Sequence, residues 1–288
     1  MMEVSKSGYY KWLNRSPTER DVKRAEAVSL VTEIHAAHKS HGYRWTAAFI
    51  RLNCSVRISD NFVYKILRIY GLRAETKHRT KYKHRKMRDK YPNLIFTTWE
   101  TVDRPRQVIV SDMTAFWAGY KYWELTMYFD VFTKQILSWS LSYKRGDRRT
   151  YINGLKDLLE ILDGVPDENH ITVIHTDQGS VYASVAYNKL ITDPNIKRSM
   201  SRAGKPTDNP VNESLNGWIK EELFLDFNLD KRDDIPQTIA KYIDFYNEMR
   251  PCYALGYDIP NHYEQRYRNG ELEKKDTFRN RVLSETPK

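Results

Sequence analysis

The sequence has few cysteines, no long apolar run and no leader-like start. Only Cys54 and Cys252 occur among its 288 residues, which excludes a disulfide framework and a four-cysteine zinc site. A transmembrane helix is excluded because no run of about 18 apolar residues occurs. The first fifteen residues lack the apolar stretch of a signal peptide. We therefore expect a soluble protein of a reducing cytoplasm.

Acidic residues are scarce in the first third of the chain. Residues 1–92 contain 21 Lys and Arg but 8 Asp and Glu, a net charge of +13, whereas residues 93–288 contain 26 and 29, a net charge of −3. This asymmetry predicts a cationic region that binds a polyanion, joined to a near-neutral domain. A basic face that serves only solubility is the alternative. The 20 Tyr and 7 Trp suit wet surfaces that face nucleic acid.

Short amphipathic helices are predicted within residues 1–72. Residues 20–39, 46–52 and 59–70 place apolar side chains at helical spacing. Three short helices with one basic face predict a helix-turn-helix DNA-binding region, whose third helix would enter the major groove. A generic helical bundle fits the same pattern equally well.

The third of these helices has clear end signals. Ser59 or Asp60 can cap its N-terminus, and Gly71 can end it. The apolar side chains expected to form its buried stripe are Phe62, Ile66 and Ile69.

Residues 73–92 are predicted to form a basic linker. Their first 18 positions hold nine Lys and Arg and two acids, with no apolar periodicity. Such a segment cannot bury a core, and we expect it to order on a phosphate backbone. An inert solvated linker is the alternative. The candidate DNA contacts within it are Lys77, Arg79, Lys81, Lys83, Arg85, Lys86 and Arg88.

From about residue 107 the pattern changes to strands that alternate with helices. Apolar, β-branched and aromatic segments predict strands at 107–112, 122–133, 135–143, 171–177 and 196–201. Helices are expected at 150–162, about 184–191 and 210–224. Three strands in hairpins followed by alternating helices and strands predict a mixed α/β sheet. It would form a core domain of residues 93–265, followed by a tail of residues 266–288.

Two of the predicted strands end in an acid. Asp112 and Asp177 each follow an apolar run, at the strand edge where ligands bind in open α/β sheets. Glu213 follows Asp177 after 35 intervening residues and lies in the next helix. Three carboxylates from two strands and a helix could hold two Mg²⁺ ions about 3.5–4 Å apart. This arrangement predicts phosphoryl transfer, which needs positioning and charge neutralisation more than a covalent nucleophile.

Several cations flank these acids along the chain. Lys220 follows Glu213 by seven residues on the same helical face and could bind a DNA phosphate beside the metals. A solvated lysine paired with a neighbouring acid is the alternative. Arg202 and Lys205 lie in a polar loop, 202–208, which we expect to form a cationic flap for a DNA end. A plain surface loop is the other interpretation.

Histidines suggest metal sites but do not predict one. His35, His38 and His41 are spaced by three residues, yet the second pair of ligands that a zinc site needs is missing. His175 precedes Asp177 by two residues and shares its strand face. We expect it to be a buried structural histidine.

Five longer segments follow one another in a family-specific order. They are SKSGYYKWLNR (5–15), HGYRWTAAFIRL (41–52), HTDQGSVYAS (175–184), SMSRAGKPTDNPVNESLNGWIKEEL (199–223) and YIDFYNEMRPCYALGYDIPNHY (242–263). They resemble the OrfB transposases of bacterial insertion sequences, which have a retroviral-integrase-type catalytic core. The resemblance covers nearly the whole chain.

The resemblance implies a fold, a cofactor and a reaction. The fold is a ribonuclease-H-like mixed five-stranded sheet with flanking helices, preceded by a small all-α helix-turn-helix region. The reaction is Mg²⁺-dependent cleavage at terminal inverted repeats, then transfer of the freed 3′-hydroxyl into target DNA, with Mn²⁺ able to replace Mg²⁺. The acids of the family's DDE signature map onto Asp112 in SDMT, Asp177 in HTDQG and Glu213 in NESLNGWIK.

The resemblance also implies partners. Double-stranded DNA, a homo-oligomer assembled on it, and a protein from a first reading frame are expected. The start of this chain lacks heptads, so it resembles the second frame alone or an element organised differently. A catalytically silent DNA-binding regulator and a ribonuclease-H-type RNA nuclease are the alternatives. The acid triad favours catalysis over the first, and the basic segment before the core favours DNA over the second.

Overall fold

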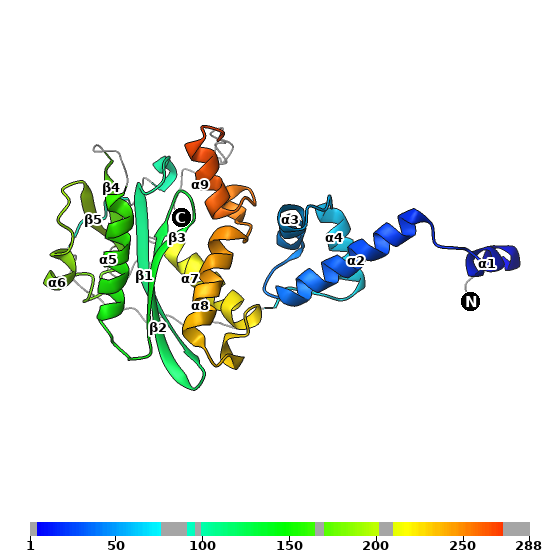
Figure 1. Cartoon of the computed structure of the whole chain (residues 1–288), viewed down its shortest axis with the longest axis horizontal. Helices are drawn as coiled ribbons and strands as arrows, with labels where there is room; N and C mark the ends of the chain where they lie inside the picture. Colours follow the sequence, from blue (N-terminus) through cyan, green and yellow to red (C-terminus); the bar gives the residue numbers. More distant parts are fainter. Residues whose placement is uncertain (1–4, 76–90, 96–98, 165–169, 202–209, 273–288) are drawn as a thin grey trace, which may run out of the picture.

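The chain folds into an N-terminal group of helices and a mixed α/β unit (Figure 1). The computed structural model describes residues 5–75, 91–95, 99–164, 170–201 and 210–272, and only the backbone of residues 100 and 210–214. Within these ranges, no helix has both the length and the apolar character needed to cross a membrane.

The N-terminal region contains four helices. They are α1 (Lys6–Leu13), α2 (Glu19–Ala37), α3 (Tyr43–Asn53) and α4 (Asp60–Ile69). Helices α2, α3 and α4 pack around one apolar cluster, whereas α1 buries no residue. The most deeply buried side chains of the cluster are those of Val31, Ala47, Ile50 and Val63. The predicted helices are therefore present, with α3 beginning three residues earlier than expected.

The ends of α4 are set by the residues that the sequence indicated. The Ser59 hydroxyl accepts a hydrogen bond from the backbone N–H of Phe62 at 3.2 Å. Gly71 follows the helix with a φ of +67°, a left-handed conformation that glycine adopts without steric cost.

The buried stripe of α4 differs from the predicted one. Val63, Ile66 and Leu67 face the core, whereas Phe62 is half-buried and Ile69 is 78% exposed. The prediction for Ile69 was wrong because two stripes of apolar residues fit a helical period on this short helix. Packing against α3 selects the stripe that contains the β-branched Val63.

The α/β unit is built on the mixed five-stranded sheet that the sequence predicts. Its strands are β1 (Val108–Ala118), β2 (Lys121–Asp130), β3 (Ile136–Ser142), β4 (Thr172–Thr176) and β5 (Ile196–Met200). Their order is β3-β2-β1-β4-β5, with β1 to β3 antiparallel and β4 and β5 parallel to β1. Three meandering strands extended by two parallel crossover strands form a ribonuclease-H-like sheet.

Helices cover both faces of the sheet. Helices α5 (Arg149–Asp163) and α6 (Val185–Asn188) pack on one face, and α7 (Pro210–Leu225) and α8 (Ile235–Glu248) on the other. Helix α9 (Pro260–Arg268) contacts α8. Short 3-10 turns lie at Trp99–Thr101, Leu229–Lys231 and Tyr253–Leu255.

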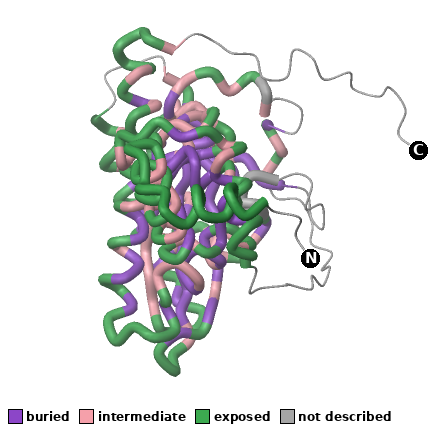
Figure 2. Tube along the Cα trace, turned by 90° about the vertical axis from the view of Figure 1, so that its right-hand side faces the viewer, coloured by how far each residue is buried: buried purple, intermediate pink, exposed green. Residues whose placement is uncertain are grey.

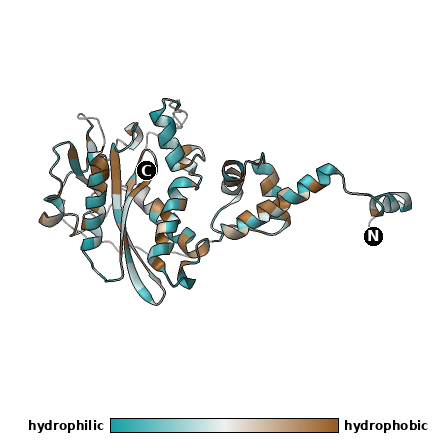
Figure 3. Ribbon diagram, in the orientation of Figure 1, coloured by the Kyte–Doolittle hydropathy of each residue, from teal (hydrophilic) through white to brown (hydrophobic). Residues whose placement is uncertain are grey.

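Burial and hydropathy follow this layering. The buried segments concentrate along the strands (Figure 2), and β1 is among the most hydrophobic elements (Figure 3). Each face of the sheet has its own apolar cluster, one with α7 and α8 and one with α5.

A buried polar network joins the N-terminal region to the α/β unit. Glu222 of α7 is fully buried and accepts hydrogen bonds from Arg250 at 2.6–2.9 Å and from the Tyr242 hydroxyl at 3.0 Å. The Nε2 atom of His41, which precedes α3, lies 3.3 Å from a Glu222 oxygen. Burial outweighs the attraction of Glu222 and lowers the pKa of His41 to about 3. The histidine is therefore neutral at pH 7.

Three further hydrogen bonds cross the same interface. Asp226, one turn after Glu222, accepts from the Ser40 backbone N–H at 3.1 Å and from the Ser40 hydroxyl at 2.8 Å. The Asn53 amide donates to the Met249 carbonyl at 3.1 Å. These bonds hold both ends of α3 against α7 and α8.

We predict that Arg250→Met destabilises the whole chain by about 3–5 kcal/mol, because Glu222 would remain buried without its cationic partner. Urea unfolding at pH 7 measures the loss. Lys23→Met is the matched control, since the Lys23–Glu19 pair has 71% and 82% exposed side chains, and it should change stability by less than about 1 kcal/mol. Equal effects of the two substitutions would contradict the importance of the buried pair.

Candidate active site

Asp112 and Asp177 come together where β1 and β4 part. The parallel pairing of the two strands ends at Ser111 and Thr176, and the next residue on each chain is one of the acids. Strand β4 stops there, whereas β1 continues to Ala118 and pairs only with β2. The expected end of a strand at Asp112 was therefore wrong. Asp112 lies within a longer strand, at the position where its parallel neighbour ends.

Asp112 faces helix α7. In the antiparallel pairing of β1 with β2, Asp112 lies opposite Met127, so the two side chains point to the same face of the sheet. The Met127 side chain lies in the core beneath α7 and α8. The Asn216 amide donates to Asp112 Oδ2 at 2.9 Å, and the Met113 backbone N–H donates to Oδ1 at 2.8 Å. Lys220 lies one turn after Asn216, and its positive charge acts on Asp112. Helix α7 thus supplies a donor and a cation to the acid.

A backbone amide and a close turn position Asp177. The backbone N–H of Gly179 donates to Asp177 Oδ1 at 2.9 Å. A Cβ atom at position 179 would lie 2.8 Å from that same oxygen, closer than real side chains come. The turn therefore needs glycine for the carboxylate to keep this position.

The electrostatics of the two acids are unfavourable without a cation. Burial and the neighbouring Asp177 charge raise the pKa of Asp112 to about 7, against the lowering effects of the Met113 N–H, Lys220 and Asn216. Burial also raises the pKa of Asp177. Burial lowers the pKa of Lys220, and the charge of Asp112 opposes that change. A divalent cation would relieve the repulsion between the carboxylates.

The floor of the site on the α5 side is made of tyrosines. The Tyr182 hydroxyl, fully buried, lies 2.9 Å from the Ser111 hydroxyl, directly beside Asp112 in sequence. The Tyr151 ring contacts the Tyr182 ring edge-on at 4.9 Å. These contacts immobilise the part of β1 that carries Asp112.

Asn216, Gly179 and Tyr182 were not predicted from the sequence. A signal for Asn216 was available, because it lies three residues after Glu213 and four before Lys220, and these positions share a helix face. Gly179 and Tyr182 become informative only when the turn after β4 is known.

Other predicted site residues lie outside the described part of the molecule. The backbone of Glu213 is in the first turn of α7, one turn before Asn216, but its side chain is not among those described. Arg202 and Lys205 lie in an undescribed segment, 202–209. The basic residues of the linker that also lie outside are Lys77, Arg79, Lys81, Lys83, Arg85, Lys86 and Arg88.

The histidines serve packing. His175 is fully buried, its Nδ1 lies 2.8 Å from the Ser199 hydroxyl, and its ring meets Trp99 edge-on, which confirms the prediction of a buried residue. His38 stacks on Phe245 of α8, and burial lowers its pKa to about 4. Among the described side chains, no group of three or more His, Cys, Asp or Glu residues is arranged around one metal position.

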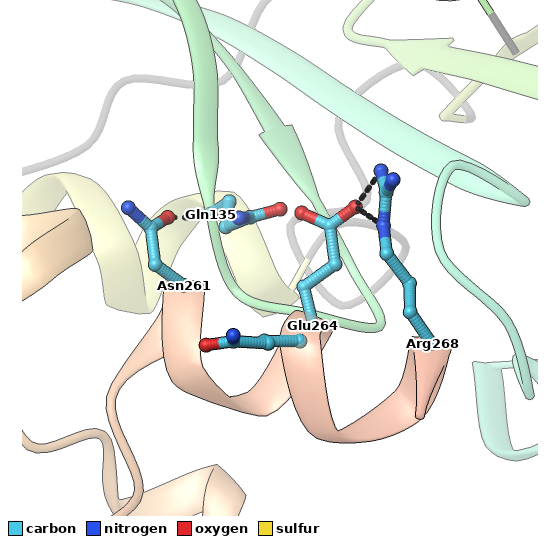
Figure 4. Close-up of a pocket in the computed structure, with 5 residues that line it drawn as sticks. Gln135, Asn261, Glu264 and Arg268 are labelled. Carbon is cyan, nitrogen blue, oxygen red and sulfur yellow. Dashed lines mark hydrogen bonds and ion pairs between the residues drawn. The ribbon is translucent and has the colours of Figure 1, made fainter. Parts of the chain in front are cut away.

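A cavity of about 320 Å³ lies away from the acids, between α9 and the start of β3 (Figure 4). The Gln135 amide donates to Asn261 at 2.8 Å, and Arg268 donates twice to Glu264 at 2.6 and 3.0 Å. The Gln135–Asn261 bond ties α9 to the turn before β3, whereas the Arg268–Glu264 pair lies within α9.

Comparison with known proteins gives the same class. Models of the integrase core domain match residues 102–206 and 195–260. A transposase of insertion sequence IS904 from Lactococcus lactis is 28% identical over 88% of this chain and 99% of its own length. An uncharacterised 31 kDa protein of insertion element IS600 from Shigella sonnei is 31% identical over 92% and 96%. The catalytic core of HTLV-2 integrase is 19% identical over 55% of this chain and 96% of its own, with a TM-score of 0.42.

A mixed sheet of this order, matched by the models of the integrase core domain, makes the chain an integrase-type polynucleotidyl transferase. The chain belongs to the transposases of bacterial insertion sequences that carry this integrase core domain. It is therefore an enzyme of the DDE class, and DNA is its partner.

We predict that Asp112→Asn stabilises the metal-free protein at pH 8. The folded-state pKa of about 7 lies above the ordinary value of 3.8, so the free energy of unfolding falls as the pH rises from about 4 to 7, and the full penalty is present above pH 7. Urea unfolding in EDTA should show a gain of about 1–3 kcal/mol at pH 8, discounted for the partial exposure of Asp112, and a smaller gain at pH 5. A gain that does not depend on pH would contradict this account.

Proposed function

We propose that Asp112, Asp177 and Glu213 bind two Mg²⁺ ions and catalyse cleavage at the ends of an insertion sequence, followed by strand transfer into target DNA. The observation that carries this proposal is the placement of Asp112 and Asp177 as neighbours at the parting of β1 and β4, facing α7. Glu213 is included because it lies one turn before Asn216 on that helix.

The donor set fits a hard divalent cation. Carboxylate oxygens are the ligands that Mg²⁺ prefers, and Mn²⁺ accepts the same set. When bound, two such ions would activate the attacking oxygen and stabilise the leaving oxygen of the phosphodiester. The raised pKa values of both acids also fit a metal site, because a bound cation would stabilise the two ionised carboxylates.

The protein's own groups orient the acids and the substrate. Asn216 holds one oxygen of Asp112 and leaves the other near the Met113 N–H, while the Gly179 N–H holds Asp177. Lys220 is half-buried beside Asp112, where its ammonium group can bind a phosphate of the DNA strand being cut. Positioning and charge neutralisation of this kind are what phosphoryl transfer requires.

The N-terminal region is proposed to bind the terminal inverted repeats. In a helix-turn-helix unit the second helix of the pair lies in the major groove. The proposal that α3 and α4 form such a pair is supported by their being consecutive helices that pack against each other. The exposed residues of α4 are Asn61, Tyr64, Lys65, Arg68 and Ile69. In the proposed organisation, residues 1–72 are the DNA-binding region, 73–92 a linker, 93–265 the catalytic core and 266–288 a tail.

Assembly is the remaining part of the proposal. Two DNA ends must be processed together for an element to move, so a homo-oligomer on DNA is expected. A protein from a first reading frame would supply additional DNA binding. A site in which the acids are intact favours this function over that of a silent regulator.

Asp177→Asn should abolish Mg²⁺-dependent nicking of duplex DNA that carries the terminal repeat, while leaving DNA affinity unchanged. The loss should be at least about 100-fold, because the amide removes a negative ligand from the metal centre. Asp157→Asn, an exposed acid in α5, is the matched control. Nicking that survives Asp177→Asn would show that the active site is elsewhere, and an inactive wild-type chain that still binds repeats would favour the regulator.

Arg68→Ala should weaken binding to terminal-repeat duplex and lower the slope of log affinity against log salt by about 1, if Arg68 contacts a phosphate. Fluorescence anisotropy between about 50 and 200 mM salt measures the slope. Lys156→Ala, an exposed cation in α5, is the control and should leave the slope unchanged. An unchanged slope for Arg68→Ala would contradict the placement of α4 on DNA.

A further inference from the structure

The β1–β2 hairpin extends beyond the rest of the sheet (Figure 1). Strand β4 leaves β1 after Ser111, and the pairing of β3 with β2 ends at Glu124. The register pairs from Phe116 to Ala118 of β1 therefore have no third strand beside them among the described residues. Tyr120 turns the hairpin with a φ of +60°.

The hairpin exposes large aromatic side chains. Trp117 is 67% exposed, and Tyr120 is fully exposed at the tip. The Trp117 ring meets the Tyr122 ring edge-on at 5.6 Å, and the Arg145 guanidinium lies over Tyr122 at 5.3 Å from its centre. We call Trp117, Tyr120, Tyr122 and Arg145 the hairpin platform. An exposed aromatic group of this kind marks a binding surface.

The hairpin platform lies on the α5 side of the sheet. Phe116 packs in the core on the α7 and α8 side with Leu229 and Ile235. Because neighbouring side chains on a strand point to opposite faces, Trp117 points away from that core. The 3-10 turn Leu229–Lys231 contacts β1 on the core side.

The accessible charges around the hairpin platform are positive. Glu124 is 3% exposed and accepts the Gly146 backbone N–H at 2.8 Å. Asp147 is 8% exposed and is bonded by Arg149. The exposed cations of the segment 144–148 are Lys144, Arg145 and Arg148, whereas Lys121 pairs with Ala118 and faces the core side. The surface is therefore complementary to a polyanion.

Exposed ring faces beside cations suit unpaired nucleic-acid bases. Cations alone bind a phosphate backbone, and duplex bases have their ring faces covered by their neighbours. An unpaired base offers its face, and stacking on an aromatic side chain contributes about 1–3 kcal/mol per base. The guanidinium over Tyr122 adds a second flat partner and a positive charge.

The hairpin platform lies within reach of the catalytic acids. Trp117 follows Asp112 by five residues along the same strand but faces the opposite side of the sheet; about 17 Å of extended chain lies between them, along the strand edge that β4 leaves after Ser111. About five base steps of a DNA strand span this distance. Tyr151, in the first turn of α5, lies between the two places, since Asp177 and Asp112 of the site and Tyr122 of the platform all act on its hydroxyl.

We propose that the hairpin platform binds unpaired bases of a DNA strand that runs to the acid pair, about five nucleotides from the phosphate held there. The position of the strand rests on the proposed function, whereas the stacking itself does not. The site would favour DNA with a single-stranded or unwound segment next to the cleavage point.

The test compares the affinity of the full-length chain for a labelled oligothymidine of about 12 nucleotides, within the usual site size of such proteins, with that for a duplex of equal length. Anisotropy in EDTA excludes cleavage. Trp117→Ala should raise the Kd for the single strand about 5- to 100-fold and leave the duplex Kd unchanged. Trp117→Phe should keep most of the affinity. Tyr253→Ala is the control, because Tyr253 is 75% exposed outside the platform.

Three results would overturn the proposal. The first is an unchanged Kd of Trp117→Ala for the single strand, and the second is an equal loss of affinity for single strand and duplex. The third is a changed sedimentation coefficient of Trp117→Ala with single-strand binding retained, which would assign the surface to contact between copies of the chain. Wild-type nicking is measured separately on repeat-ended duplex with Mg²⁺. If the wild-type chain does not nick the duplex but Trp117→Ala loses single-strand binding, the proposed function is contradicted and the platform proposal is supported. If the wild-type chain nicks the duplex but Trp117→Ala binds the single strand unchanged, the platform proposal is contradicted and the proposed function is supported.

Discussion

Asp112 and Asp177 repel each other, and the backbone pairing of β1 with β4 keeps them together. The parallel ladder ends one residue before both acids. The pairing of Ser111 with Thr176 therefore fixes the backbone next to the two acids, and their carboxylates take no part in that pairing. The fold thus opposes the electrostatic cost with the cooperative stability of the sheet. Acids kept together at an electrostatic cost are a common result of function limiting stability.

Helix α7 connects this site to the N-terminal region. Asn216 and Lys220 are one turn apart; Asn216 donates to Asp112, and the charge of Lys220 acts on it. Glu222 and Asp226 are also one turn apart, and they contact His41 and Ser40 of the N-terminal region. Because six residues advance the helix by about 240°, these two pairs occupy different faces. Movement of the N-terminal region would therefore act on the helix whose Asn216 holds Asp112.

Much of the sheet could be predicted because each strand has a β-branched or aromatic run bounded by turn residues. The predicted position of Asp112 at a strand end failed because the apolar run before the acid is followed by MTAFWA, whose residues alternate between two differently covered faces. Sequence spacing placed Lys220 on the helix of Glu213, but the bond of Asn216 to Asp112 depends on the approach of α7 to β1, which no local pattern encodes. Ile69 was misplaced for the related reason that two apolar stripes fit one short helix.

The long β1 carries the proposed chemical site and the proposed binding surface on one element. A strand that ended at Asp112 would have left the acid on a loop, where its position would depend on few contacts. Continuation to Ala118 anchors the acid on both sides through pairing with β2, and it carries aromatic side chains outward on a rigid two-stranded arm. Rigid elements position functional groups more accurately than loops do. The same strand therefore fixes the acid at its middle and presents aromatic rings to solvent at its end.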